Sequence, residues 1–259
     1  MNGIRDLHPA SIARLLDGGR IGHTVICFDT TGSTNSAASR MVEAGAREGT
    51  VVLAARQTAG RGRKGREWYS SEYGSLVFSV ILTPARSGET LTALLALSAL
   101  KILDRSCEGA MIKWPNDIWV GGRKIAGILA ESKGESVVLG MGLDVNDDED
   151  SFPGGLAGTA VSLRMLAGKR FDRGELLGSL LAEFTSMYET WERDGFGPVS
   201  FEMERRMLWM GSRVNLDAGA EEITGTISGI TSDGYLRLET DVGEKVYSSG
   251  DVSLRKDTE

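Results

Sequence analysis

Residues 110–146, AMIKWPNDIWVGGRKIAGILAESKGESVVLGMGLDVN, decide the fold class of this 259-residue chain. Strand-like runs follow one another there in quick succession, at 110–114, 118–120, 123–132 and 136–146. Pro115-Asn116-Asp117 and Gly121-Gly122 have the composition of turns between such runs. Because these strands do not alternate with helices, a doubly wound parallel sheet is not expected. The stretch predicts a mixed, mostly antiparallel sheet in an α+β domain.

The segments around this stretch supply further strands and the helices that would flank the sheet. Strands are predicted over 23–29, 50–57 and 75–82. Helices are predicted over 9–17, 35–44, 90–106, 173–193 and 198–210. Ser33 or Thr34 can cap the helix over 35–44, since both side chains can accept a backbone hydrogen bond. We therefore expect residues 1–210 to form one domain.

The sequence changes character at Gly211. From there to Leu254 it contains only short β-like pieces, RVNL, ITGTISGI, YLRLET, EKVYS and DVSL. Asp233-Gly234 and Asp241-Val242-Gly243 are turn sequences between them. Closely spaced strands over about 45 residues are typical of a small barrel. Residues 211–259 are therefore predicted to form a separate SH3-like β-barrel.

Composition excludes several classes of function. The net charge is −7, from 36 acidic and 29 basic residues, so no overall positive field attracts nucleic acid or an anionic membrane. The only histidines, His8 and His23, are too few for most zinc sites and precede every chemical motif. Cys27 and Cys107 make no disulfide framework. Without a signal peptide or an apolar run near the ~20 residues of a membrane span, we expect a cytoplasmic protein.

One basic segment stands out against this acidic background, GRGRKGR at residues 60–66. It matches G-x-G-x-x-G, but a dinucleotide fingerprint requires a helix directly afterwards, and a loop and a strand follow here. The phosphate-loop pattern fails because Arg66 stands where Lys-Ser/Thr is required. Glycines let backbone N–H groups approach an anion, and guanidinium groups bind phosphate or carboxylate. The segment is therefore a solvated turn, a nucleic-acid contact, or a loop that closes over a polyanionic small molecule.

Two further clusters favour the small molecule. KWPND at 113–117 places a cation, an amide and a carboxylate within five residues. Asp117 is able to ligate Mg²⁺ as nucleotide sites require, although Asn and Asp after Pro are also common turn residues. Lys124 begins the next strand, where Gly127 permits close approach, although a lysine at a strand end is usually solvated. Three cationic clusters separated by strands fit a nucleotide site.

Five motifs stand in the order seen in biotin–protein ligases: STN at 33–35, QTAGRGRKGREW at 57–68, KWPND at 113–117, RKIAGIL at 123–129 and G-x-G at 140–142. The chain resembles that family over roughly residues 23–255. The resemblance implies a catalytic domain of the class II aminoacyl-tRNA-synthetase/biotin-synthetase type. It implies that biotin and MgATP are joined as biotinyl-5′-AMP with release of pyrophosphate. A lysine of a biotin carboxyl carrier protein domain then takes the biotinyl group.

The resemblance also implies roles for individual residues. Lys124 and Arg63 would be catalytic, Lys124 as the cation that bridges the biotin carboxylate and the α-phosphate. Biotin would contact Ser33, Thr34, Asn35, Gln57, Gly60, Arg61, Gly62, Arg63, Lys124 and Gly127. ATP would contact Arg63, Arg66, Trp68, Lys113, Asn116, Asp117, Lys124 and Asp144. Asp117 and Asp144 would hold Mg²⁺.

The sequence departs from the family in two places. Asp144 stands where the family has Asn in G-x-G-x-N, so an extra carboxylate either strengthens metal binding or repels phosphate. Only 22 residues precede the first predicted strand. That leaves no room for the winged helix-turn-helix of the repressor-type members, so we expect no DNA-binding role. Many members of the family form dimers, which implies a homodimer.

The chemistry is physically reasonable without a histidine base. A carboxylate that attacks a triphosphate brings two anions together, so positioning and charge neutralisation dominate the catalysis. The nearest alternative is a lipoate–protein ligase, but that family carries a His-Asp motif and no histidine follows His23 here. A nucleic-acid-binding module would need a basic face with interleaved aromatic residues, whereas Glu67, Glu72 and Glu89 lie nearby in the sequence.

Overall fold

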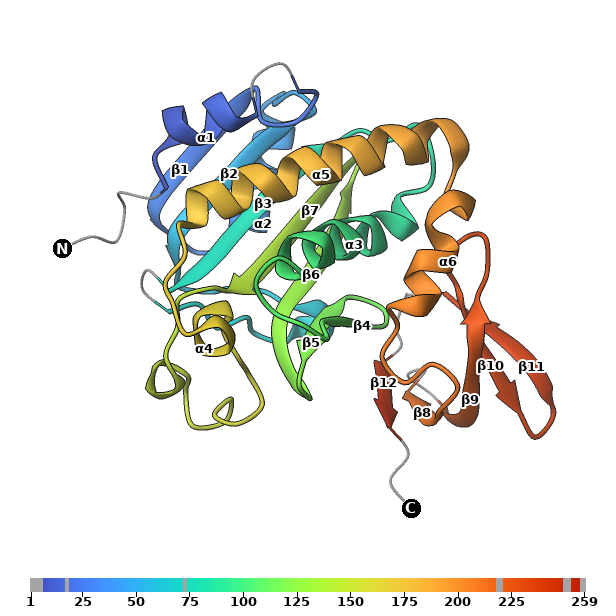
Figure 1. Ribbon diagram of the computed structural model, residues 1–259. Helices are drawn as coiled ribbons and strands as arrows, with labels where there is room; N and C mark the ends of the chain where they lie inside the picture. Colours follow the sequence, from blue (N-terminus) through green and yellow to red (C-terminus); the bar gives the residue numbers. More distant parts are fainter. Residues whose placement is uncertain (1–6, 17–18, 72–73, 218–220, 249–252, 257–259) are drawn as a thin grey trace.

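The computed structural model describes residues 7–16, 19–71, 74–217, 221–248 and 253–256, which form two β-sheets with helices packed against the larger one (Figure 1). The larger sheet has seven strands of mixed direction, and the smaller sheet has five antiparallel strands. The predicted α+β class is confirmed. No helix within the described ranges is long and apolar enough to cross a membrane.

The large sheet has the strand order β1-β2-β3-β7-β6-β5-β4. Its strands are β1 (Thr24–Thr31), β2 (Thr50–Gln57), β3 (Ser75–Leu82), β4 (Met111–Lys113), β5 (Asp117–Val120), β6 (Arg123–Lys133) and β7 (Ser136–Asp144). Only β1 and β2 pair in parallel, and every other pair is antiparallel. Residues 110–146 thus form consecutive antiparallel strands, as predicted. Gly121 and Gly122, both with positive φ, form the turn between β5 and β6, where glycine is favoured.

The two faces of this sheet carry different helices, and strand alternation decides which residues each face receives. In β7, Leu139 and Met141 belong to the main core, whereas Gly140 and Gly142 point to the opposite face. The main core lies under α1 (Pro9–Leu15), α3 (Leu91–Leu103) and α5 (Arg173–Asp194). The opposite face is covered by α2 (Thr34–Glu43) with a small core of its own. The face with α2 therefore has room for a functional site.

The C-terminal sheet has the order β11-β10-β9-β8-β12. Its strands are β8 (Arg213–Asp217), β9 (Glu222–Ile230), β10 (Leu236–Thr240), β11 (Gly243–Tyr247) and β12 (Ser253–Lys256). Alternate residues such as Val214 and Leu216 are buried, so the sheet has a dry inner face. It lies beside the β4–β5 end of the large sheet (Figure 1). The small β domain is present, and its boundary at 210/211 stays a prediction.

The helix predicted over 198–210 is shorter than expected. Helix α6 (Gly197–Arg205) ends where the chain turns to pair with β4. Ile112 donates its N–H to the Arg206 carbonyl at 2.7 Å, and Leu208 donates to the Ile112 carbonyl at 2.8 Å. The Arg206 carbonyl and the Leu208 N–H therefore pair with β4, and they are not available for the hydrogen bonds that would continue helix α6. The short helix α4 (Leu163–Ala167) completes the set of described α-helices.

Candidate active site

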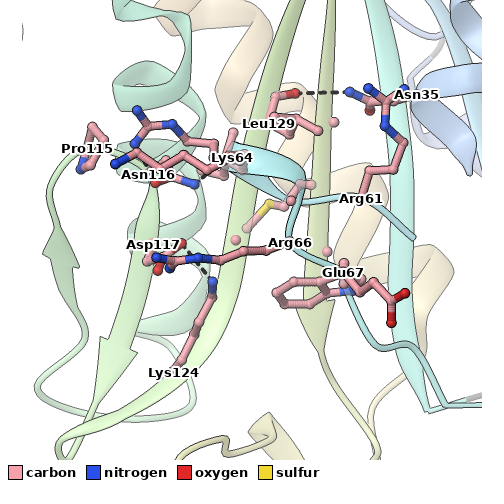
Figure 2. A pocket seen from close by; sticks show the side chains of 18 of the residues that line it. Asn35, Arg61, Lys64, Arg66, Glu67, Pro115, Asn116, Asp117, Lys124 and Leu129 are labelled. Atoms are coloured by element: carbon pink, nitrogen blue, oxygen red, sulfur yellow. Dashed lines mark hydrogen bonds and ion pairs between the residues drawn. The ribbon is translucent and has the colours of Figure 1, made fainter. Parts of the chain in front are cut away.

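A cleft of about 210 Å³ opens on the α2 face of the large sheet (Figure 2). Its wall comes from the start of α2, the end of β2 and the loop after it, residues 113–117, β6, β7 and β12. The structure brings all but two of the predicted site residues, Gly60 and Asp144, into this wall: Ser33, Thr34, Asn35, Gln57, Arg61, Gly62, Arg63, Arg66, Trp68, Lys113, Asn116, Asp117, Lys124 and Gly127. Elements far apart in the sequence therefore share one site.

The start of α2 is held by Gln57 at the end of β2. Gln57 Oε1 accepts a hydrogen bond from the Thr34 backbone N–H at 2.7 Å and from its hydroxyl at 3.1 Å. One of the N–H groups that a helix start leaves unpaired is thereby satisfied. Ser33 occupies the N-cap position of this helix, one of the two residues predicted for it, but its side chain makes no capping hydrogen bond. Ser33 instead lines the cleft.

Asn35 fastens α2 to two strands. Its Oδ1 accepts a hydrogen bond from the Ser79 hydroxyl at 2.6 Å. Its Nδ2 donates to Glu131 Oε2 at 2.9 Å. It also donates to the Leu129 carbonyl at 3.3 Å (Figure 2). A Cβ on Gly140 would lie 1.8 Å from Asn35 Oδ1, so β7 needs a glycine there. Both ends of the Asn35 amide are therefore engaged in holding the wall.

The glycine–arginine loop, residues 60–66, is fastened at several points. Arg61 Nη2 lies 2.5 Å from Glu131 Oε1 on β6. Arg63 Nη1 donates to Asn116 Oδ1 at 3.3 Å, which ties the loop to the β4–β5 turn. Lys64 Nζ lies 3.3 Å from Asp217 Oδ2 of the C-terminal sheet. The two ion pairs, Arg61–Glu131 and Lys64–Asp217, are partly exposed, and exposed pairs each contribute about 0–1 kcal/mol. The loop is thus positioned by weak contacts that ligand binding is able to rearrange.

Trp68 lies against two glycines of the sheet. Gly127 and Gly142 face each other across β6 and β7. A Cβ at 142 would lie 2.2 Å from Trp68 Cε2, and one at 127 would lie 3.0 Å from Cζ3. The backbone N–H of Trp68 donates to the Gly60 carbonyl at 3.0 Å, and a Cβ on Gly60 would lie 2.3 Å from the Trp68 carbonyl oxygen. Gly60 therefore shapes the loop without entering the cleft wall.

Cations gather on the β4–β6 side of the cleft around one carboxylate. Lys124 Nζ lies 2.8 Å from Asp117 Oδ1 (Figure 2). Lys113 Nζ lies 4.5 Å from the centre of the Trp119 ring and 5.1 Å from that of Trp209. Burial lowers the pKa of the Lys113 ammonium, and the charge of Asp117 raises it. The nearby cations Lys124, Arg255 and Arg66 lower this pKa further. Such a concentration of positive charge favours a polyanionic ligand.

Asp144 lies outside the cleft wall. Its side chain is 5% exposed, and Ser75 Oγ lies 3.4 Å from its Oδ1. Burial raises the pKa of Asp144 well above its usual range, and the neighbouring Asp147 raises it further. Lys124 has the opposite effect. Across the described ranges there is no group of three or more His, Cys, Asp or Glu side chains that could hold a metal ion.

Asp144→Asn is expected to raise the melting temperature at pH 8 and to flatten its pH dependence. The pKa of Asp144 is higher in the folded protein than in the unfolded chain, where an aspartate has a pKa of about 4. The free energy of unfolding therefore falls as the pH rises from about 4 through the pKa of Asp144 in the folded protein. Asparagine does not ionise, so we expect the variant to melt above the wild type at pH 8 and the difference to be smaller at pH 5. Thermal melts at pH 5 and pH 8 measure it.

The matched control for this change is Asp150→Asn, because Asp150 is exposed. It is expected to leave the melting temperature unchanged at both pH values. An Asp144→Asn protein that melts lower than the wild type at pH 8 would contradict the expectation. A change in the Mg²⁺ concentration that the Asp144→Asn protein needs for activity would support the sequence-based prediction that Asp144 holds Mg²⁺.

Sequence reasoning missed Glu131, Arg255 and the wall positions of Gly140 and Gly142. The glycines belong to the G-x-G run, so that motif already contained the signal. Glu131 is two residues beyond Leu129 on β6, and period-2 alternation places both on the cleft face. Arg255 lines the cleft from β12, far along the chain from the motifs, and no local pattern indicates this.

Comparison with known protein families gives two matches. Residues 27–146 match the biotin/lipoate A/B protein ligase family, and residues 210–255 match the biotin protein ligase C-terminal domain. The chain is 35% identical over 243 residues to the bifunctional ligase/repressor BirA of Bacillus subtilis, across 90% of this chain and 75% of that protein. It is 34% identical over 233 residues to the biotin–[acetyl-CoA-carboxylase] ligase of Mycobacterium tuberculosis, across 86% of this chain and 85% of that one.

A solved structure shares the fold. The biotin protein ligase of Aquifex aeolicus, in complex with biotin and ATP, superposes with a TM-score of 0.82 at 31% sequence identity. The superposition covers 90% of this chain and 99% of that protein. The first family match begins in β1 and ends just after β7, and the second begins before β8 and ends in β12.

Proposed function

The chain belongs to the biotin/lipoate A/B protein ligase family, and we propose that it is an ATP-dependent biotin–protein ligase whose cleft binds biotin and ATP side by side. Biotin is activated as biotinyl-5′-AMP with release of pyrophosphate, and its biotinyl group then passes to a lysine of a biotin carboxyl carrier domain. One observation supports the site most: Arg63, Lys113 and Lys124, from three separate segments, line the same cleft.

The first step requires charge neutralisation more than acid–base chemistry. The biotin carboxylate is already an ionised nucleophile at neutral pH, so no general base has to activate it. It attacks the α-phosphorus of ATP, and pyrophosphate leaves. Two anions repel each other unless fixed cations lie where they meet, and preorganised cations act strongly in a partly dry cleft. We assign Lys124 to that meeting point, because its ammonium lies beside both Asp117 and the Trp68 ring.

The two ends of the cleft suit the two substrates. We assign the polar wall at the start of α2, with Ser33, Thr34 and Gln57, to the ring end of biotin. Arg61 and Gly62 of the loop then lie over its carboxylate end. Asn35 serves this wall indirectly, since both ends of its amide are bonded to protein groups. Residues assigned to ATP are Arg63, Arg66, Trp68, Lys113, Asn116 and Asp117.

Gly142→Ala tests the assignment of Trp68 to the nucleotide. The new Cβ would lie 2.2 Å from the indole and must displace it. Base–aromatic stacking is worth about 1–3 kcal/mol, so we expect the KM for ATP to rise about tenfold, with the KM for biotin nearly unchanged. Gly154→Ala is the matched control, because a Cβ there meets nothing within 4 Å. Equal effects on both KM values would contradict the assignment.

Mg²⁺ accompanies ATP in this proposal, and Asp117, the cleft carboxylate beside Lys124, would hold it. Mg²⁺ at nucleotide sites commonly takes one or two protein carboxylates together with phosphate oxygens and waters. Asp117, a carboxylate that lies among several cations, fits that donor set, whereas the other cleft carboxylate, Glu67, belongs to the loop side of the cleft. Asp144 is not assigned, because its oxygens lie beside Ser75 and Asp147 outside the cleft wall. When bound, the ion would neutralise phosphate charge.

In the second step the carrier lysine attacks the acyl carbon of the adenylate. An amide bond forms, AMP leaves with the bonding electrons, and the amine loses a proton. Because an acyl adenylate hydrolyses readily, the loop over residues 60–66 has to limit water access until the carrier arrives. We expect this reaction in the cytoplasm, where the free thiols of Cys27 and Cys107 stay reduced, and from a homodimer.

Exchange of labelled pyrophosphate into ATP tests the proposal directly. The expected result is exchange that depends on biotin and on Mg²⁺. Exchange with lipoate in place of biotin would instead identify a lipoate–protein ligase. No exchange with either acid would reject the adenylate chemistry. The second step is read as biotin attached to a purified carrier domain, and a carrier whose target lysine is replaced by arginine should remain unlabelled.

A further inference from the structure

Glu131 joins two walls of the cleft. It lies on β6 on the same face as Gly127 and Leu129. Its Oε1 lies 2.5 Å from Arg61 Nη2, and its Oε2 accepts a hydrogen bond from Asn35 Nδ2 at 2.9 Å. One carboxylate thus contacts both the glycine–arginine loop and the start of α2. Glu131 itself stands outside the described cleft lining.

We infer that Glu131 is a positioning residue for biotin binding. Glu131 acts through Arg61 and touches no substrate itself. This rests on the proposed function. The Arg61 side chain is 51% exposed, so without a partner it would sample many rotamers. Ordering such a side chain on binding has an entropic cost that weakens affinity. Glu131 orders it beforehand, and Asn35 in turn fixes the carboxylate.

The Arg61–Glu131 contact is poorly suited to a purely stabilising role. Both side chains are partly exposed, 51% and 26%, and exposed ion pairs add little to the free energy of unfolding. Asn35 also contacts Ser79 and Leu129, neither contact involves Glu131, and both are expected to remain in a Glu131 variant. Gln57 still holds the first N–H of α2. Loss of the carboxylate should therefore alter ligand binding and leave the fold intact.

The test is Glu131→Gln, which keeps the size of the side chain and removes its charge. In biotin-dependent pyrophosphate exchange, we expect the KM for biotin to rise about tenfold. The kcat and the KM for ATP should stay within about twofold of the wild type. The matched control is Glu43→Gln, because Glu43 is also half of a surface ion pair, with Lys133 at 2.6 Å. It is expected to change neither KM.

A double-mutant cycle separates positioning from a structural effect. If Glu131 acts through Arg61, then Glu131→Gln made in an Arg61→Ala protein should change the KM for biotin by less than about twofold. Additive effects would overturn the inference, as would an unchanged KM in the single variant. A lowered melting temperature with kcat and both KM values altered would also overturn it. Absence of exchange in the wild type would instead reject the proposed function.

Discussion

Lys124→Ala is expected to slow adenylate formation about 10²–10³-fold, on the order of 3–4 kcal/mol. Lys124 Nζ lies 2.8 Å from Asp117 Oδ1 and 5.3 Å from the centre of the Trp68 ring. The ammonium is thus held where the proposed biotin and nucleotide sites meet. Alanine would leave the carboxylate and the α-phosphate to approach each other without that cation. Pyrophosphate exchange at saturating biotin and ATP measures the loss.

The control for this substitution lies at the other end of the same strand. Lys133 pairs with Glu43 at 2.6 Å on the surface, so Lys133→Ala removes a lysine from β6 without touching the cleft. It is expected to retain the wild-type rate. Thermal melting should show both variants folded, because the Lys124–Asp117 pair is partly exposed. Near-normal turnover of Lys124→Ala would show that Lys124 is a solvated strand-end residue.

Arg63→Gly is expected to make the adenylate and then lose it about 30–150-fold faster than the wild type. Arg63 Nη1 contacts Asn116 Oδ1 at 3.3 Å, so its guanidinium spans from the loop to the β4–β5 turn across the proposed phosphate position. Guanidinium groups bind phosphate in bidentate fashion, and loss of one costs about 2–3 kcal/mol of affinity. Most of such a loss is seen in the dissociation rate.

Released adenylate should label lysines on bystander proteins. Incubation with biotin, MgATP and an unrelated lysine-rich protein, followed by detection of biotin, measures this release. Lys64→Gly is the matched control: it removes a neighbouring cation and adds the same glycine, but Lys64 contacts Asp217 rather than Asn116. If Arg63→Gly forms adenylate and labels bystanders no more than the wild type, Arg63 does not retain the intermediate.

Local patterns predicted most of the fold. The strands expected over 50–57 and 75–82 have those bounds in the structure, because β-branched and apolar runs of this length are buried in the sheet centre. The helix expected over 173–193 differs by one residue at its end. The helix prediction over 198–210 was wrong in its second half. Ile112, far away in the sequence, forms backbone hydrogen bonds with Arg206 and Leu208. Pairing of that kind leaves no local signature.

The candidate site divides in the same way. Motif residues in loops and at strand ends, such as Arg63 and Lys124, could be selected from sequence because their residue types and glycine neighbours suit anion binding. Asp144 was selected by its place in a motif, yet Ser75 and Asp147 surround it outside the cleft. Whether a motif residue lines the cleft is therefore decided by three-dimensional packing.

By itself the sequence determined most of the segments that form strands and helices, and which cationic and glycine-rich motifs they carry. Periodicity, turn chemistry and composition are local properties, so they can be read without knowing what packs against what. The tertiary structure alone decided that Glu131 meets Arg61, 70 residues earlier, and that Arg255 reaches the cleft from the C-terminal sheet. It also decided that Asn35 is bonded to β3 and β6. Burial, ion pairing and pKa depend on neighbours brought together from distant parts of the chain, and the packing of the two sheets supplies those neighbours.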